Sequence, residues 1–328
     1  MSLSKMLEDK SHKEFQDIIR SAIPSKNEFH TMSGKPAFST AYTQISEYNL
    51  SNNNSAAIVG TAFDYLARTI TLRYIGYYHK NAFNGSTAES GLKLLERLVL
   101  KNDLRAIRII NKNYKDGIQL FLKYLKHKVE LKDIIPVACF FAKLEQFYRS
   151  AVPPKEIERY LIENENAEEV LNDLDDLCKV YETNFLNDDV LKSDSKIALN
   201  PNFGIGSALC TGADADIIIE DTLNDFKTSK KLGYNWKEVA QITGYLLLHN
   251  IAKRCKNANY HMNEVEIKRI GFYRARYGEI EYFDVDEGFR ESLKETESLL
   301  IDYLTTNKDI AGHMLLKYGI EVEELEFM

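Results

Sequence analysis

A short stretch in the C-terminal half of the chain carries two acidic residues and a lysine at a spacing that suits a β-hairpin. Asp216 precedes an apolar run, residues 220–221 can form a two-residue turn, and the returning segment reads Asp225-Phe226-Lys227. In that register Asp216 lies across from Asp225, and cross-strand partners point to the same face. Alternation along the strand adds Lys227 to this face and turns Phe226 away from it. Two carboxylates and an ammonium would then converge, a set that suits a divalent cation beside a water or an anionic oxygen.

A predicted helix follows the hairpin and adds a polar pair. Residues 236–250 have apolar side chains at helical spacing, and Gln241 and Tyr245 lie within them, four positions apart. Residues at i and i+4 share one face of a helix. Taken alone, these elements also fit a solvated hairpin with cross-strand ion pairs, followed by an amphipathic helix with a polar stripe.

The acid, the acid-x-Lys strand and the Gln–Tyr helix, in this order and at these distances, resemble the PD-(D/E)xK nuclease superfamily. The match is to its RecB-like branch, which carries a QxxxY element. The resemblance covers about residues 206–274 and a separate element at 60–64. It implies an α/β fold with a restriction-endonuclease-like core, which is a small mixed β-sheet flanked by helices, next to a large helical N-terminal half.

The same resemblance implies a set of site residues. The metal, Mg²⁺ or Mn²⁺, would be held by Asp216, Asp225 and the carbonyl of Phe226. Lys227 would position the attacking water or stabilise charge on the phosphate, and Gln241 and Tyr245 would orient the phosphate backbone or the metal waters. The products would carry 5′-phosphates.

Two acids on predicted helices are further candidate ligands. RecB-like nucleases often carry a GxxxH signature with a metal-binding His, and the helix predicted at 55–68 has Gly60 and Asp64 at this spacing. A carboxylate suits Mg²⁺ or Mn²⁺ at least as well as an imidazole, so Asp64 is expected to be a ligand, with an ordinary surface acid as the alternative. Glu145 lies in a dense apolar helix and can pair with Arg149. We expect Glu145 to be structural, with a ligand role as the alternative.

The charge of the chain limits the ways in which it could bind nucleic acid. The net charge is −7, whereas tight nucleic-acid binders usually have a basic footprint. Basic residues gather around the motif, at 227–237 and 268–276. This local excess predicts transient contact with nucleic acid, DNA rather than RNA, or a protein partner that delivers the substrate. A solvated turn explains such basic runs equally well.

Cysteines and hydropathy exclude several protein classes. The four cysteines are scattered without any CxxC pair, which argues against a disulfide framework, a zinc ribbon and an iron–sulfur cluster. The N-terminus has no signal-peptide pattern, and no stretch approaches the ~20 apolar residues of a membrane span. We therefore expect a cytoplasmic protein without membrane contact.

The chain is expected to divide into three parts. These are a mainly helical region at 1–195, a nuclease core at 196–290, and a C-terminal helix and tail at 291–328, with a helix at 55–74 that belongs to the core. Within the core, strands are predicted at 205–211, 264–273 and 279–285.

These observations predict a Mg²⁺- or Mn²⁺-dependent deoxyribonuclease that hydrolyses phosphodiester bonds. The alternatives are a catalytically silent subunit for nucleic-acid binding or assembly, and a hydrolase of another phosphoester. Exonuclease and endonuclease action both fit the sequence, and the sequence does not fix the oligomeric state.

Overall fold

A computed structural model describes residues 2–83, 85–98 and 103–327. In this part of the chain a single mixed sheet contains six strands in the order β1-β6-β5-β4-β3-β2. Strands β4 and β5 are parallel, and the other neighbours are antiparallel. The strands are β1 (His30–Thr31), β2 (Ile197–Leu199), β3 (Ile217–Ile219), β4 (Thr222–Lys227), β5 (Arg269–Arg274) and β6 (Glu279–Asp284). The protein is therefore α/β, as predicted, with a mixed sheet flanked by helices.

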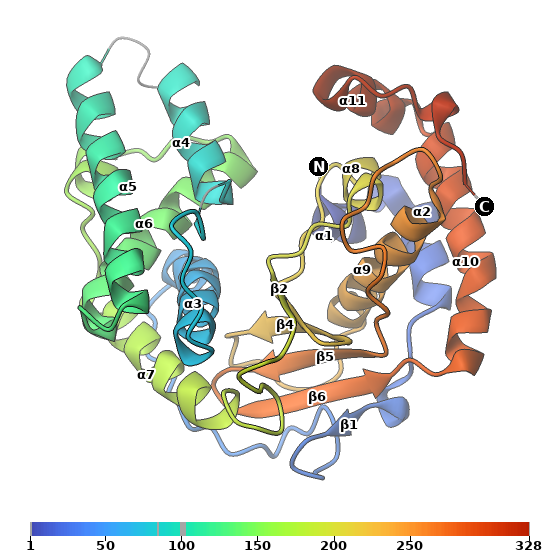
Figure 1. The fold of residues 1–328 in the computed structure, drawn as a ribbon, viewed down its shortest axis with the longest axis horizontal. Coiled ribbons are helices and arrows are strands. Elements are labelled where there is room, and N and C mark those ends of the chain that lie inside the picture. The colour runs from blue at the N-terminus through green and yellow to red at the C-terminus, as the bar shows by residue number, and fades with distance from the viewer. Residues whose placement is uncertain (1, 84, 99–102, 328) are drawn as a thin grey trace.

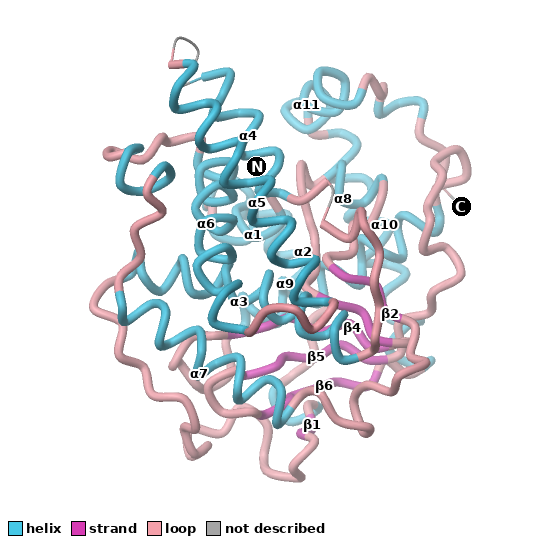
Figure 2. The backbone as a smooth tube through the Cα atoms, turned by 60° about the vertical axis from the view of Figure 1, so that its left-hand side comes forward, coloured by secondary structure: helices cyan, strands magenta, loops and turns pink. Residues whose placement is uncertain are grey.

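The two faces of the sheet pack into different hydrophobic cores, with helices on both sides (Figures 1 and 2). Ile217 and Ile219 of β3 join the core of the helical N-terminal half, whereas Ile218 joins the core on the opposite face. This division follows from the strand repeat, because successive side chains point to opposite faces. All three isoleucines are buried, so the strand reads as a continuous apolar run.

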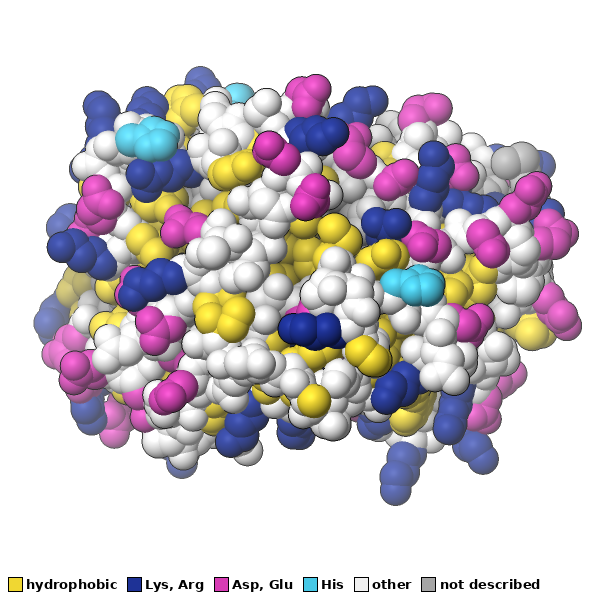
Figure 3. All heavy atoms as spheres, turned by 90° about the horizontal axis from the view of Figure 1, so that it is seen from below, with side chains coloured by type: hydrophobic (Ala, Val, Ile, Leu, Met, Phe, Trp, Pro, Cys, Tyr) yellow, Lys and Arg dark blue, Asp and Glu magenta, His cyan; other side chains and the backbone are white. Residues whose placement is uncertain are grey.

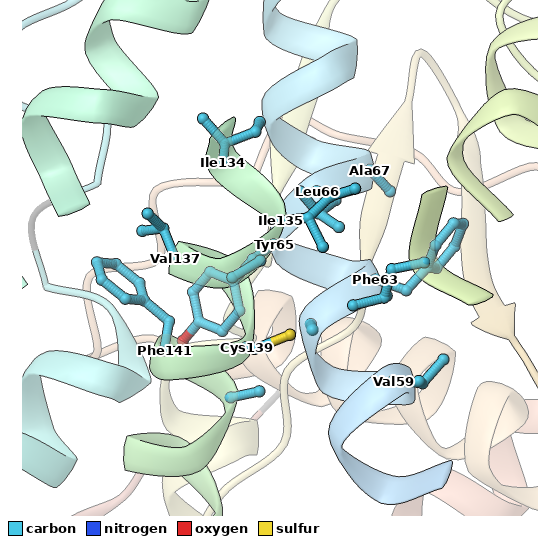
Figure 4. Close-up of a cluster of buried hydrophobic side chains, with 14 of the residues drawn as sticks. Val59, Phe63, Tyr65, Leu66, Ala67, Ile134, Ile135, Val137, Cys139 and Phe141 are labelled. Carbon is cyan, nitrogen blue, oxygen red and sulfur yellow. The ribbon is translucent and has the colours of Figure 1, made fainter. Parts of the chain in front are cut away.

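Five long helices form the layer on the first face. They are α3 (Asn53–Tyr74), α4 (Thr87–Leu98), α5 (Leu104–Leu125), α6 (Leu131–Ser150) and α7 (Glu168–Asn184), with a short π-helical turn at Glu158–Ile162. Helix α3 packs between α6 and the sheet. Figure 4 shows Tyr65 of α3 pointing toward Phe141 of α6, with Phe63 pointing to the other side. There the ring of Phe63 meets Phe226 of β4 at a centroid distance of 5.9 Å. Asp64 lies between these two anchoring aromatic residues.

The second face is covered by helices from both ends of the chain. They are α1 (Leu3–Glu8), α2 (Lys13–Ser21), α8 (Ile205–Leu209), α9 (Trp236–Arg254), α10 (Glu287–Thr306) and α11 (Lys308–Tyr318), with 3₁₀ turns at Lys10–His12, Lys26–Glu28 and Val322–Glu324. Helix α9 connects β4 to the parallel strand β5, which forms a βαβ unit. Helices α1 and α2 contact α9, so N-terminal residues complete the layer that covers the core sheet.

A buried ion pair joins the helical layer on the first face to the sheet. Arg276, just after β5, makes two 2.7 Å hydrogen bonds to the carboxylate of Asp173 on α7. Its remaining donors reach the backbone carbonyls of Thr228 and Glu47. The side chains of Arg276 and Asp173 are 0% and 2% exposed, so each charge depends on its partner for solvation.

Several sequence-based boundaries are wrong. The segment predicted as the first core strand, 205–211, is helical at Ile205–Leu209, and β2 at Ile197–Leu199 takes the edge position of the sheet. The C-terminal tail expected at 291–328 contains a further helix, α11. The strand predicted at 279–285 is present as β6, and the one predicted at 264–273 is present as β5 but begins only at Arg269. None of the described helices has the length and apolarity needed to cross a membrane.

Candidate functional site

The β3–β4 hairpin has the register that the sequence predicts. Ile217 pairs with Asn224 and Ile219 with Thr222, which leaves residues 220–221 as the two-residue turn. The backbone at Glu220 has a φ of 54°, the left-handed conformation that such turns need. Asp216 precedes β3, and its Oδ2 accepts a 2.5 Å hydrogen bond from the backbone N–H of Phe226. The hairpin thus holds Asp216 beside the end of β4.

A chain of polar contacts runs from β4 to helix α9. Lys227 Nζ lies 2.5 Å from Asp225 Oδ2 and donates a 3.2 Å hydrogen bond to Gln241 Oε1. Gln241 Nε2 donates to the hydroxyl of Tyr245 at 2.8 Å and to Ser4 Oγ of α1 at 3.3 Å. Gln241 and Tyr245 therefore share a helix face, as predicted, and this face is turned toward the acid-x-Lys strand.

The charged side chains in this series of polar contacts are largely buried. The side chains of Asp225 and Lys227 are 6% and 17% exposed. Burial opposes the charge on Lys227, but the carboxylates of Asp225 and Glu238 outweigh it and raise the pKa of the ammonium. Burial, and then the charge of Asp225, raises the pKa of Tyr245 well above its usual value. Lys227 is consequently a fixed cation, and Tyr245 a neutral hydroxyl that can donate a hydrogen bond.

Helix α3 brings Asp64 to the same group of carboxylates. Burial, followed by the charge of Asp216, raises the pKa of Asp64 well above its ordinary value, and Glu145 and Asp225 add to this effect. Arg68, one turn further along α3, opposes it and donates from Nε to the backbone carbonyl of Asp64. The structure thus places Asp64 within electrostatic reach of both hairpin acids, although 152 residues of sequence separate it from Asp216.

Asp216 is influenced by its neighbours in the same way. Burial, and then the charge of Asp225, raises the pKa of Asp216 to about 7. The N–H of Phe226, Lys227 and Arg68 lower it in part. Carboxylates that crowd each other in a poorly solvated site cannot all ionise without a compensating cation.

Glu145 lies beside this group in a hydrogen-bonded position. One oxygen accepts a 2.7 Å hydrogen bond from the hydroxyl of Tyr65, and the other accepts from Arg149 Nε at 2.8 Å. The same guanidinium lies 3.3 Å from Asp214 Oδ2. Both oxygens of Glu145 thus have protein partners, which fits the structural role expected for it.

Sequence reasoning missed several of these contacts. Arg68 follows Asp64 by four residues, so local spacing could have indicated its contact with Asp64, whereas Asp214 meets Arg149 from 65 residues away. Ser4 comes from the opposite end of the chain, and no local pattern links it to Gln241.

The residues present suit a hard divalent cation by chemistry. Three carboxylates and a backbone carbonyl are oxygen donors of the kind that Mg²⁺ and Mn²⁺ prefer, and the raised pKa values of Asp64 and Asp216 reflect negative charge that a cation would offset. Among the described residues, however, no three His, Cys, Asp or Glu side chains are arranged to hold an ion as they stand.

Comparisons of the chain with protein-family models, with curated proteins and with solved structures found no match.

Proposed function

We propose that this protein is a metal-dependent nuclease with a restriction-endonuclease-like core, acting on DNA. The observation that carries the proposal is the position of Asp216 against the end of β4, beside the Asp225–Lys227 ion pair. The charge of Asp64 acts on the same carboxylates. The β3–β4 hairpin, α9 and parallel β5 support the fold assignment, because they supply the acid, the acid-x-Lys strand and the Gln–Tyr helix in one unit.

In this proposal the carboxylates of Asp216 and Asp225, the Phe226 carbonyl and Asp64 hold Mg²⁺ or Mn²⁺. When bound, such an ion lowers the pKa of a coordinated water and offsets charge on the scissile phosphate. Lys227 contributes a cation held in place by Asp225 and Gln241, which stabilises the extra negative charge of the transition state. The hydroxyl of Tyr245, oriented by Gln241, is a donor for a phosphate oxygen.

A catalytically silent subunit with the same fold is the second candidate. It is favoured by the short Lys227–Asp225 ion pair and by the absence of a ready metal-binding group among the described residues. In that case the polar cluster would only join β4 to α9.

One assay separates the two candidates. The protein is incubated with linear duplex DNA, circular duplex DNA, single-stranded DNA and RNA, each with Mg²⁺, Mn²⁺ or EDTA. Metal-dependent cleavage by the wild type and none by Asp225→Asn supports the nuclease. No cleavage of any of the four substrates refutes it.

A further inference from the structure

A cavity of about 1090 Å³ adjoins Glu145, whose ion-pair partner Arg149 lines it. It is bounded by α1, the start of α3, the C-terminal end of α6 and the segment at 152–167. Arg149 in its wall pairs with Glu145, and Lys5 Nζ donates to the carbonyl of Arg149 at 2.9 Å. Ser4, next to Lys5, accepts from Gln241. One wall of the cavity is thus linked to the candidate site through Arg149 and through Ser4, the neighbour of Lys5.

The cavity lining is basic although the chain is acidic overall. Among the described residues that line it, two are acidic, Glu156 and Glu165, and both pair with Arg159. Five are basic, namely Lys5, Lys143, Arg149, Lys155 and Arg159. Figure 3 shows a different pattern on the face that carries β1, where basic and acidic side chains are interspersed. The charge of the cavity is therefore a local property that suits an anionic ligand.

Two of these cations lie against neutral oxygens. Lys143 is 2% exposed, and its Nζ donates to Asn164 Oδ1 at 3.1 Å and to the backbone carbonyl of Glu165 at 2.8 Å. Lys5 also donates to a carbonyl. Burying an ammonium without a contacting carboxylate is unfavourable, and burial lowers the pKa of Lys143 to about 8. A phosphate group in the cavity would supply the missing negative charge.

Aromatic rings and size indicate which anion fits. Lys143 Nζ lies 4.8 Å from the ring centroid of Tyr160, and the Tyr160 hydroxyl donates to Gln146 at 3.1 Å, so the ring is held in a fixed orientation. Phe147 also lines the cavity. Cations combined with aromatic rings are the usual means of binding unpaired nucleotides, whose bases stack on the rings. The volume, about 1090 Å³, is at the upper end of the range of roughly 300–1,000 Å³ for ligand sites, so it is large enough for more than one nucleotide.

We propose that this cavity receives the unpaired end of a polynucleotide strand and leads it to the carboxylate cluster. The proposal rests on the proposed nuclease function, and it narrows the substrate to DNA with a single-stranded end. A base inside a duplex is already stacked on its neighbours and cannot stack on the ring of Tyr160. Duplex DNA would therefore enter only after its end has opened.

The test measures binding without cleavage. A fluorescent oligothymidylate of about 12 nucleotides, within the usual range for single-strand sites, is titrated with the protein in EDTA at several salt concentrations. Lys155→Glu should weaken binding several-fold and reduce the slope of log K against log salt by about 0.7, the contribution of one phosphate contact. Tyr160→Leu should weaken binding roughly fivefold or more through lost stacking. The control Lys132→Glu carries the same charge change on an exposed lysine at the other end of α6 and should bind like the wild type.

Each other result refutes the proposal. Unchanged affinity in both Lys155→Glu and Tyr160→Leu would remove the cavity from the binding site. Equal competition by inorganic phosphate or thymidine monophosphate would assign it to a small ligand, and equal binding of a blunt duplex would exclude the requirement for an unpaired end. Because the binding assay contains EDTA, its outcome does not depend on cleavage. If the protein cuts DNA but both substitutions leave binding unchanged, only the proposal for the cavity is refuted. If the substitutions weaken binding but the protein never cuts DNA, only the proposed nuclease function is refuted.

Discussion

Replacing Asp216 by asparagine should remove much of the pH dependence of the stability of the metal-free protein. Burial and the charge of Asp225 raise the pKa of Asp216 from its ordinary 3.8 to about 7. A carboxyl with a raised pKa in the folded state contributes stability that is complete below about pH 4 and is lost as pH rises through 7. At about 1.36 kcal/mol per pH unit, the upper limit is about 4 kcal/mol. Because Asp216 is only partly buried from solvent, we expect about 2 kcal/mol.

Urea unfolding in EDTA at about pH 5 and about pH 8 measures this loss. These two conditions span about two thirds of the pH range over which the loss develops, so wild type should lose about 1.3 kcal/mol more than Asp216→Asn between them. Asparagine keeps an oxygen that can accept from the N–H of Phe226, so the hairpin contact is retained. Asp302→Asn, which changes an exposed carboxylate on α10, is the control and should follow the wild type. Equal pH dependence in wild type and Asp216→Asn would show that the carboxylates do not strain each other, and the argument for a cation there would lose its basis.

The remaining predictions concern the proposed ligands and the ion pair that joins α7 to the sheet. Asp225→Ala should abolish both Mn²⁺ binding by calorimetry and DNA cleavage, whereas Lys227→Ala should keep Mn²⁺ binding and lower the cleavage rate by roughly 10²–10³. Equal Mn²⁺ affinity in wild type and Asp225→Ala would exclude Asp225 as a ligand. Asp64→Ala should be severely impaired in cleavage, and Asp64→His should retain measurable activity with a changed Mg²⁺/Mn²⁺ preference. If Asp64→Ala cuts as well as wild type, Asp64 has no role in the site. Asp173→Ala should lower the free energy of unfolding by roughly 3–5 kcal/mol, because it leaves the buried Arg276 guanidinium without its counter-ion. A loss below about 1 kcal/mol would mean that solvent reaches Arg276.

The part of the site that local sequence rules control was predictable. A two-residue turn fixes the register of a hairpin, so the position of Asp216 opposite the end of β4 followed from counting residues. The shared face of Gln241 and Tyr245 followed from the helical repeat, and the 2.8 Å contact between them agrees with it. Both inferences involve residues no more than ten apart, where backbone geometry leaves few alternatives.

The segment 205–211 shows where such rules fail. A short apolar run fits a buried strand and a buried helix equally well. The structure forms α8 there, and the close approach of its backbone to α9 decides the outcome. A Cβ at Gly206 would lie 2.3 Å from the carbonyl oxygen of Leu248, so a side chain there would require the helices to separate. This contact between distant segments has no signature in the local sequence.

The positions of Asp64 and Ser4 in the site could not be predicted from local sequence either. Their distance from the hairpin depends on how the two helical layers close on the sheet, with Phe63 packed against Phe226 on one face and α1 against α9 on the other. The carboxylates therefore lie where two separately packed cores meet, and neither core can relax there without disturbing the other. A site built in this way can hold charges close together that a single flexible loop would let drift apart, because the packing energy of both layers opposes their separation. The free energy of unfolding that the protein loses when Asp216 ionises then measures how firmly the fold holds these charges together.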